Sequence, residues 1–252
     1  MAIVLISEVG GDLRLLPASL EYYKSLGIDS ILITLHVRRR DSIEENWVHR
    51  TVASFDGVLA SIWCDPTLNH VRRFQERNRA IAQYCSDSDW IVNADIDEFH
   101  EYPLPLPEMV RECERSQFAY VKGTIVDRIA ANGSLPELNP KDLWQQFPLR
   151  TRITKNILGA NDQKVALSRA FVRTSPGHHC VHPEDEEFKH SWRSVNVHHF
   201  KWDSDVVPRL RARIEDLRRE CRNWYSESQA FLDYLDANGG SIPVNDPRLE
   251  IF

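Results

Sequence analysis

Short apolar runs alternate with longer segments of helical spacing over the first hundred residues. The apolar runs predict β-strands, and the segments between them predict α-helices. The strands are expected at 3–6, 29–37, 58–63 and 90–94, and the helices at 13–26, 42–53 and 67–84. Strands joined by helices of this length pair in parallel through right-handed crossovers. The alternation therefore predicts an α/β fold with a Rossmann-like, mostly parallel central sheet flanked by helices.

The rest of the chain predicts a less regular part and a helical end. Further strands are expected at 118–126, 164–173 and 194–202, with a loop rich in Gly, Pro and Asn at 130–144. From Asp205 onward a long helix is expected, because apolar residues follow a 3-4 spacing. This core-facing stripe consists of Val207, Leu210, Ile214, Leu217, Cys221 and Trp224.

Charge and cysteine usage narrow the class of protein. The net charge of −6 argues against nucleic-acid binding, which needs a basic surface. The five cysteines are scattered and form no CxxC pair, so neither a zinc site nor a disulfide framework is indicated. A reducing cytoplasm is therefore the expected location. No run approaches the roughly twenty apolar residues of a membrane span, so any membrane association is expected to be peripheral.

The fourth expected strand ends in a cluster of carboxylates within residues 90–100. In an extended chain residues i and i+2 share a face, so Asp95 and Asp97 are expected to project together. Adjacent carboxylates repel each other unless a cation lies between them, and oxygen ligands suit Mg²⁺ or Mn²⁺ bridging to substrate phosphates. We favour this metal-phosphate interpretation over the alternative, a polar strand end capped by turn-forming aspartates.

Two other strands are expected to end at the same edge of the sheet. Glu8 follows the first strand, and His36 and Arg38 follow the second. Ligands of parallel sheets gather at the carboxyl ends of the strands. These three side chains, with Asp95, are therefore candidates for binding a cofactor or substrate.

Histidines gather in one part of the chain, because six of the ten fall between residues 178 and 199. They are His178, His179, His182, His190, His198 and His199. Imidazole is a common transition-metal ligand, and adjacent residues in a strand point to opposite faces. Most of the six are expected to be ordinary surface or core side chains. At least one, with His179 and His199 as candidates, is expected to complete the metal site, and a mixed shell favours Mn²⁺ over Mg²⁺.

Three carboxylates are candidates for a general base that deprotonates a substrate hydroxyl. Glu184 and Asp185 belong to a run of four acids, most of which are expected in solvent. Asp127 lies beside Arg128, with which it could equally form an ordinary ion pair. The sequence leaves the choice among the three open.

Six arginines are expected to lie on the C-terminal helix. They are Arg209, Arg211, Arg213, Arg218, Arg219 and Arg222. We expect them to form a solvated face paired with Glu215, Asp216 and Glu220. The alternative is that this face binds an anionic acceptor or, peripherally, membrane headgroups.

Four stretches in order along most of the chain resemble GT-A type glycosyltransferases of the bacterial family-2-like and family-92-like group. They are Glu8 with residues 15–29, Asp95-Ile96-Asp97-Glu98-Phe99, residues 123–128 with Gly133, and residues 164–167 with 177–179 and 197–201. The resemblance implies a GT-A-like fold and the metal-dependent transfer of a sugar, a hexose above all, from a nucleotide-diphosphate donor. The expected donor is a UDP-sugar rather than a GDP-sugar. The expected acceptor is a hydroxyl of a glycan or a lipid-linked molecule, as in polysaccharide biosynthesis, and the reaction is expected to invert the anomeric centre.

The resemblance also implies roles for individual residues. Asp97 would be the direct ligand of Mn²⁺ or Mg²⁺, and Asp95 would contact the ribose or the metal. His199 or His198 would support the metal or the diphosphate. The implied organisation is one catalytic domain at 1–202, with a nucleotide-binding half at 1–100 and an acceptor half at 101–202, followed by a helical extension at 203–252.

The chain also departs from the family. Family-2 enzymes often carry Arg-Asn-Glu after the first strand, where Ile6-Ser7-Glu8 stands here, and an acidic turn after the second strand, where residues 36–41 are mostly basic. The Gln-x-x-Arg-Trp motif of processive synthases is not found, which disfavours polymerisation.

Two other classes of function remain open. A metal-dependent phosphohydrolase or nucleotidyltransferase could use the same carboxylates with Glu8 as a third acid, although no Walker-type phosphate loop is present in the sequence. A non-catalytic nucleotide- or glycan-binding domain is the other alternative. The adjacent acids argue against it, because a site without a function has no reason to keep charges that cost stability.

Overall fold

The computed structural model describes residues 1–66, 69–220 and 223–252, so the expected helical residues Thr67, Leu68, Cys221 and Arg222 lie outside the described part. The chain forms two compact units. The first consists of Met1–Thr124 and Gln163–Val197, and the second of Ile125–Asp162 and His198–Phe252. The domain division expected from the sequence, a catalytic domain at 1–202 and a helical extension at 203–252, stays a prediction.

The first unit contains the strand–helix alternation that the sequence predicts. Its elements are β1 (Ile3–Val9), α1 (Leu16–Ser25), β2 (Ser30–Val37), α2 (Ile43–Ala53), β3 (Val58–Cys64), α3 (His70–Tyr84), β4 (Trp90–Asn93), β5 (Glu98–Glu101), α4 (Leu106–Ser116), the start of β6 (Tyr120–Ile129), β8 (Gln163–Arg169), the short 3-10 helices η1 (Pro176–His178) and η2 (Pro183–Asp185), and most of β9 (His190–His199). The strand at β5 and the helix at α4 were not expected from the sequence.

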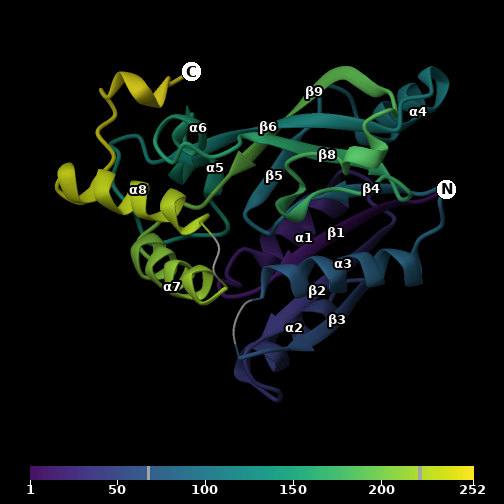
Figure 1. Ribbon diagram of the computed structural model, residues 1–252, viewed down its shortest axis with the longest axis horizontal. Coiled ribbons are helices and arrows are strands. Elements are labelled where there is room, and N and C mark those ends of the chain that lie inside the picture. Colours follow the sequence, from purple (N-terminus) through teal and green to yellow (C-terminus); the bar gives the residue numbers. More distant parts are fainter. Residues whose placement is uncertain (67–68, 221–222) are drawn as a thin grey trace. The chain divides into compact units, whose positions relative to one another are not determined.

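The sheet of the first unit has the order β3-β2-β1-β4-β8-β6-β9-β5 (Figure 1). The neighbouring strands from β3 to β4 pair in parallel. Strand β8 pairs antiparallel with both β4 and β6. Strands β1 and β2 are almost wholly buried, as expected for continuous apolar runs covered on both faces. The α/β fold with a Rossmann-like parallel sheet is therefore confirmed for β1 to β4.

The order of the parallel strands reverses at β1. The chain moves from β1 outward to β3 and then returns to β4 on the other side of β1. Because crossovers are right-handed, α1 and α2 cover one face and α3 covers the other. Helix α2 contacts β2 and β3, and α3 contacts β1 and β2 (Figure 1). Sheets of this kind bind ligands outside the carboxyl ends of the strands at such a reversal, which here are β1 and β4.

The second unit holds the shorter elements and the C-terminal helices. They are the end of β6, α5 (Leu143–Gln146), β7 (Leu149–Thr151), α6 (Ile153–Asn156), the end of β9, α7 (Val206–Arg219), α8 (Tyr225–Ala237) and η3 (Pro247–Leu249). Strand β7 pairs antiparallel with the second half of β6. The expected irregular stretch at 130–144 is confirmed up to residue 142, after which α5 begins.

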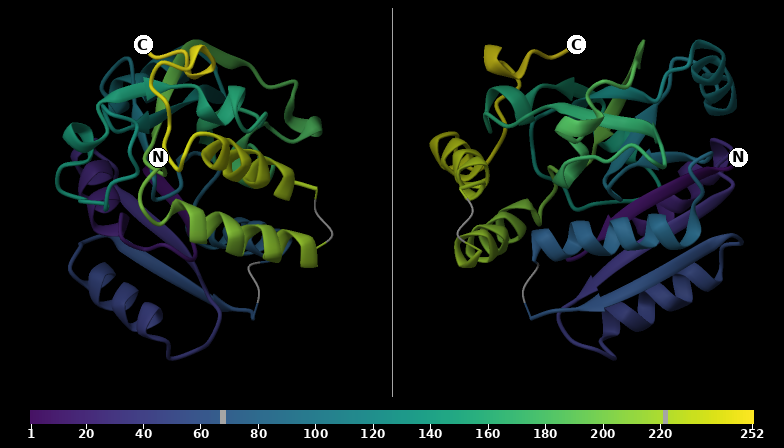
Figure 2. Two further views of the ribbon diagram at one scale, coloured as in Figure 1. Left: turned by 90° about the vertical axis from the view of Figure 1, so that its left-hand side faces the viewer. Right: turned by 45° about the vertical axis from the view of Figure 1, so that its right-hand side comes forward.

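One long C-terminal helix was expected, and the structure has two helices, α7 and α8, side by side (Figure 2). A single helix over 206–237 would extend about 48 Å and carry its second half away from the core. Two shorter helices instead contribute to one apolar cluster, with Leu210 and Ile214 from α7 and Phe231 and Leu235 from α8. Burial of both apolar faces therefore outweighs the continuity of the helix.

Arg219 of α7 pairs with two of the expected acids, whereas Arg209 pairs with the buried Asp203, which was not expected. Arg219 lies 3.6 Å from both Glu215 and Asp216, and Arg209 lies 3.1 Å from Asp203. Within the described residues, no helix is long and apolar enough to cross a membrane. Peripheral contact with a membrane stays a prediction.

The backbone of the second unit depends on Gly133. This residue has a φ of +71°, and a Cβ there would collide with the carbonyl oxygen of Ile242, whose N–H donates to the Gly133 carbonyl at 2.8 Å. We expect Gly133→Ala to lower the free energy of unfolding by about 3 kcal/mol or more, because strain and collision add.

The matched control is Gly159→Ala in the same unit. Gly159 has a φ of +65° and no atom within 4 Å of a built Cβ, so only the cost of a left-handed backbone, about 1–2 kcal/mol, should appear. Urea unfolding of both variants measures the difference. Equal destabilisation would contradict the role of the Ile242 contact.

Candidate active site

The carboxylates that follow β4 lie in a tight turn. Strand β4 ends at Asn93, and the Glu98 N–H donates to the Asp95 carbonyl at 3.0 Å. The Glu98 carboxylate in turn accepts from the Asp95 N–H at 3.2 Å. Asp95 and Asp97 were expected to share the face of an extended strand, and this geometry is wrong because the chain reverses there. Both side chains are half-buried within the turn.

Arg73 of α3 fixes the first of these carboxylates. Its Nη2 donates to the Asp95 Oδ1 at 2.6 Å, and its Nε lies 3.5 Å from the Oε1 of Glu8. Strands β1 and β4 pair in register from Ile3 to Ile6, which brings the ends of the two strands together under this guanidinium. One cation therefore neutralises acids from two neighbouring strand ends.

Glu8 is itself buried and ionised. Burial alone would raise the pKa of this carboxyl group, but the Arg73 charge and a hydrogen bond from His178 hold it well below the ordinary value. Sequence analysis proposed Glu8 as a cofactor ligand. The structure places it beneath the site, where it fixes Arg73 and His178.

His178 completes the pairing of Glu8. Its Nε2 lies 3.1 Å from the Glu8 Oε2, and its Nδ1 lies 3.0 Å from the Thr174 hydroxyl. Burial lowers the pKa of His178 to about 4, with Arg77 contributing. The imidazole is therefore neutral at pH 7, donates from Nε2 to the carboxylate and accepts from Thr174 at Nδ1. A left-handed backbone, with φ of +59° after Gly177, holds it in place.

A second buried ion pair supports the acidic turn from β8. The Lys164 ammonium lies 2.7 Å from the Glu98 carboxylate, and the two side chains are only 2% and 4% exposed. Lys164 also donates to the Gly177 carbonyl at 2.8 Å. Burial opposes the charge on Lys164, but the charges of Glu98 and Asp95 outweigh it and raise the pKa of the ammonium. Sequence analysis singled out neither Arg73 nor Lys164 as a site residue, because their partners lie far away along the chain.

The four candidate metal ligands fall into different surroundings. Asp95 and Asp97 share the turn, and His179 is half-buried with its Nδ1 2.9 Å from the Gln163 carbonyl. His199 belongs to the second unit. Within the described residues, no three His, Cys, Asp or Glu side chains are grouped to hold a metal ion. The predicted set of four metal ligands stays a prediction. Two of its members, Asp95 and Asp97, lie in the turn.

His36 and Arg38, the other candidates for cofactor binding, contact the segment that follows β3. The His36 ring lies 4.5 Å from the Trp63 ring, and its Nε2 lies 2.9 Å from the Asp65 carbonyl. Arg38 is exposed and donates to the Pro66 carbonyl at 2.9 Å. Their predicted contact with a cofactor stays a prediction.

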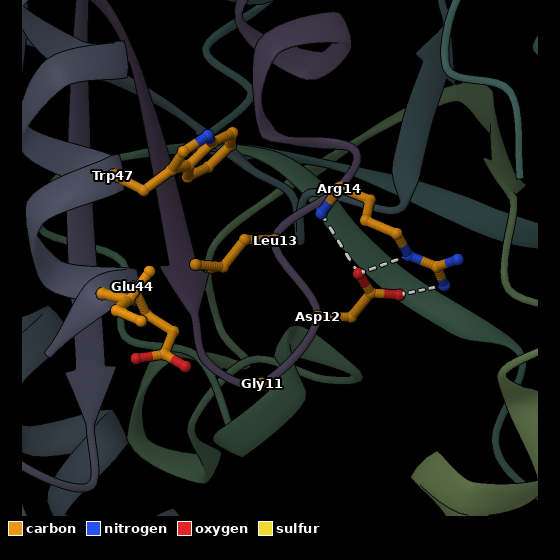
Figure 3. A pocket seen from close by; sticks show the side chains of 7 residues that line it. Gly11, Asp12, Leu13, Arg14, Glu44 and Trp47 are labelled. Carbon is orange, nitrogen blue, oxygen red and sulfur yellow. Dashed lines mark hydrogen bonds and ion pairs between the residues drawn. The ribbon is translucent and has the colours of Figure 1, made fainter.

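A pocket of about 420 Å³ lies beside the loop that follows β1 (Figure 3). Its lining consists of Gly11, Asp12, Leu13, Arg14, Ile43, Glu44 and Trp47. Trp47 and Leu13 point towards each other across it, and Asp12 binds the outward-pointing Arg14 at 2.6 Å. This pocket was not predicted from the sequence. The available signal was the pair Gly10-Gly11 directly after the first strand.

Asp127, a candidate base, is the centre of a buried cluster in the second unit. It is 0% exposed and accepts from the Thr154 N–H at 2.6 Å, the Thr154 hydroxyl at 2.9 Å and the Trp202 indole at 3.0 Å. His199 Nδ1 lies 3.3 Å from the same carboxylate. Arg128 has other partners, including the Phe147 carbonyl, so the alternative of an Asp127–Arg128 pair is not what the structure shows. Asp127 anchors α6 and orients His199, and its role as a base stays a prediction.

The other two candidate bases lie in η2 of the first unit. Asp185 is buried and accepts from the Arg173 N–H at 2.7 Å and from its guanidinium at 2.6 Å. Hydrogen bonding by Arg173 lowers the pKa of Asp185. Glu184 is exposed and lies 2.8 Å from the same guanidinium. Both acids therefore hold Arg173.

Comparison with known proteins gives a limited result. No protein-family model matches the sequence, and no curated protein matches it. Among solved structures, HddC from Yersinia pseudotuberculosis is similar at 15% identity over 55% of this chain, with a TM-score of 0.33, and this chain spans 65% of its length. A 4-diphosphocytidyl-2C-methyl-D-erythritol synthase is similar at 15% identity over 67% of this chain and 74% of that chain, with a TM-score of 0.36. At such TM-scores the α/β assignment rests on the strand order described above.

The Lys164–Glu98 pair provides a test of what holds the turn. We expect Lys164→Met to lower the free energy of unfolding by about 3–5 kcal/mol, because it leaves a buried carboxylate without its counter-charge. Combining it with Glu98→Gln should recover part of the loss. Urea unfolding measures both, with Lys122→Met on the exposed part of β6 as the control. A loss no larger than that of the control would contradict the assignment.

The His178–Glu8 pair predicts a pH dependence. The folded pKa of His178, about 4, lies below the ordinary value of 6.5, so the unfolded chain binds a proton first as the pH falls. The contribution of His178 to stability is therefore full above pH 6.5 and is lost between pH 6.5 and 4. We expect His178→Gln to make the free energy of unfolding less dependent on pH across this range. An unchanged slope would contradict a buried neutral imidazole.

Proposed function

We propose that the chain is a glycosyltransferase whose first unit binds a nucleoside diphosphate sugar at the carboxyl ends of β1 and β4. The observation that carries this proposal is the turn with two half-buried carboxylates, Asp95 and Asp97, at the point where the strand order reverses. It is held by the half-buried pair Arg73–Asp95 and by the buried pair Lys164–Glu98. Buried charges cost stability unless they are paired, and a turn that needs this much support is typical of a functional site.

The donor set of this turn fits a divalent cation. Mg²⁺, and by the same argument Mn²⁺, is commonly held by one or two carboxylates together with substrate phosphates and water rather than by a cage of protein ligands. Asp97, with Asp95 beside it, would hold the ion, which would neutralise the charge that develops on the departing diphosphate. Without a cation, two carboxylates would repel the diphosphate.

The pocket beside the β1–α1 loop supports a nucleotide. Trp47 and Leu13 offer apolar walls to a flat base, and the carboxylates of Asp12 and Glu44 can accept from its N–H groups. The loop and the acidic turn belong to the same unit.

The chain's own residues then have separate tasks. Arg73 fixes the Asp95 side chain, and Lys164 fixes Glu98, which in turn binds the Asp95 N–H. The turn is thus preorganised before a ligand arrives, so little ordering has to be done during binding. An inverting transfer also needs one base for the acceptor hydroxyl, by analogy with inverting glycosidases. Asp127, Glu184 and Asp185 stay our candidates for it.

Nucleotidyl transfer is the second candidate function. The observation that favours it in this chain is the Gly10-Gly11 loop, in which Gly11 has a φ of +82° and no atom within 4 Å of a built Cβ. Such a loop leaves room for the phosphates of a nucleoside triphosphate.

A ligand screen by thermal unfolding separates these candidates. The ligands are UDP, GDP, CMP, common UDP-sugars and the triphosphates UTP and CTP, each with and without Mn²⁺. A ligand at 100 times its dissociation constant adds about 2.7 kcal/mol of stability. Stabilisation by a UDP-sugar with Mn²⁺ supports glycosyl transfer. Stabilisation by UTP or CTP, but by none of the UDP-sugars, favours nucleotidyl transfer. No response to any nucleotide overturns the proposal.

Asp97→Asn tests the acidic turn directly. We expect it to abolish the Mn²⁺-dependent shift and turnover together, because the amide keeps the shape of the side chain but removes the charge that holds the cation. Asp87→Asn, at an exposed position before β4, is the matched control and should behave as the native chain. Retention of the full shift by Asp97→Asn would remove Asp97 from the site.

A further inference from the structure

The sheet of the first unit begins with an edge strand that lacks the usual protection. Strand β3 stands first in the order of the described sheet, with β2 as its neighbour (Figure 1). Its seven residues, Val58–Cys64, include no charged residue and no proline, and the register with β2 runs without a shift. Soluble proteins usually cover such an edge or protect it with charges, prolines or bulges. The strand at the opposite end, β5, has only four residues and includes two glutamates.

The parallel pairing with β2 leaves alternate backbone groups of β3 facing outward. The Ile31 N–H donates to the Gly57 carbonyl at 2.9 Å, and the Asp65 N–H donates to the Val37 carbonyl at 3.1 Å. Every second residue of a strand bonds the same neighbour in a parallel ladder, so the odd-numbered residues of β3 face β2. The N–H and C=O groups of the even-numbered residues therefore point away from the sheet.

Two arginine side chains bind outward carbonyls at the end of β3. The Ile62 carbonyl accepts from Arg40 at 3.0 Å, and the Cys64 carbonyl accepts from Arg72 at 3.2 Å. Both carbonyls belong to even-numbered residues, as the parallel ladder requires. A carbonyl has two lone pairs, so each can accept a second hydrogen bond. The middle of the edge, around Ala60, is the part that a further strand can reach.

The middle of β3 is also exposed on one face. Leu59 is 49% exposed, and Ser61 beside it is exposed as well. Both share a face with Trp63, because residues i and i+2 of a strand point the same way. Arg72 of α3 lies over the Trp63 ring at 5.3 Å. Contact with α3 therefore covers the end of this face and leaves an apolar side chain in water at its middle.

We propose that two copies of this chain pair through β3, antiparallel about a twofold axis at Ala60. The outward groups of Ala60 bond those of Ala60 in the second copy, and Val58 pairs in the same way with Ile62. Leu59 then lies opposite Ser61 of the second copy and diagonally beside its Leu59, which covers the exposed face. This inference does not rest on the proposed function.

The charges at the two ends of the edge are complementary in this pairing. Arg40, bound at the Ile62 carbonyl, faces Val58 of the second copy, two residues from the exposed Asp56. The twofold axis repeats this contact, so two pairs of opposite charges flank the apolar middle. A parallel pairing would instead bring the arginines of both copies to the same end. Charge therefore favours the antiparallel arrangement of two copies.

Helix α2 fits the same arrangement. It contacts both β2 and β3. Two such helices would lie about 10 Å apart across the axis, because about two strand spacings separate them. This is close to the distance between packed helices. The side of α2 away from the pocket carries the exposed residues Asn46, His49 and Ala53 at helical spacing, with no acidic or bulky apolar side chain among them. The helices can therefore approach as the strands pair.

Sedimentation velocity of the full chain tests the pairing. We expect the native chain to form a dimer and Leu59→Lys to raise its dissociation constant about 10-fold or more, because lysine on an edge strand opposes pairing. Tyr84→Lys on α3 is the matched control, since Tyr84 is also 49% exposed, and it should dimerise as the native chain does. A native chain that is monomeric at every concentration overturns the proposal, as does normal dimerisation of Leu59→Lys.

Cysteine cross-linking tests the register. Cα atoms of a hydrogen-bonded antiparallel pair lie about 5.5 Å apart, which is within disulfide range. Ala60→Cys should therefore form a covalent dimer when oxidised with diamide. Ser61→Cys should form much less, because diagonal positions lie about 7–8 Å apart. The native chain treated in the same way gives the background from its own cysteines. Cross-linking of Ala60→Cys at the background level, or no better than that of Ser61→Cys, contradicts the proposal.

Discussion

The guanidinium of Arg73 is the contact on which the candidate active site depends. It lies between Glu8 at the end of β1 and Asp95 after β4, at 3.5 and 2.6 Å. Parallel strands bring their carboxyl ends to one edge, and acids collected there repel one another unless cations separate them. Arg73 from α3 and Lys164 from β8 supply that separation, which allows a tight acidic turn to persist in a buried setting.

The second unit satisfies a buried carboxylate differently. Asp127 accepts hydrogen bonds from Thr154, Trp202 and His199. The donors are a backbone N–H, a hydroxyl and ring N–H groups, so hydrogen bonds satisfy this buried carboxylate. In the first unit the ion pairs leave the carboxylates of Asp95 and Asp97 half-buried in the turn. In the second unit the Asp127 carboxylate orients the His199 imidazole. The same residue type thus lies half-buried in a turn of one unit and orients an imidazole in the other.

Much of the fold could be predicted because it follows from local patterns. Continuous apolar runs gave β1 to β4, and a helix stopped by Gly27 gave α1, which begins where Pro17 fits the first turn. Strand β5 and helix α4 were missed. The single C-terminal helix was wrong because tertiary burial, which spacing alone does not report, favours two helices on one core.

The sequence by itself determined the alternation of strands and helices from β1 to β4 and the edge at which the acids gather, since both depend on residues close together in the chain. Only the tertiary structure decided which of those acids are neutralised and which stay half-exposed. Glu8 is paired with Arg73 of α3 and with His178, which follows β8, and Glu98 is paired with Lys164 of β8. A pattern within one segment cannot name them, because the pairs arise from antiparallel strand pairing and from the cost of burying a charge alone.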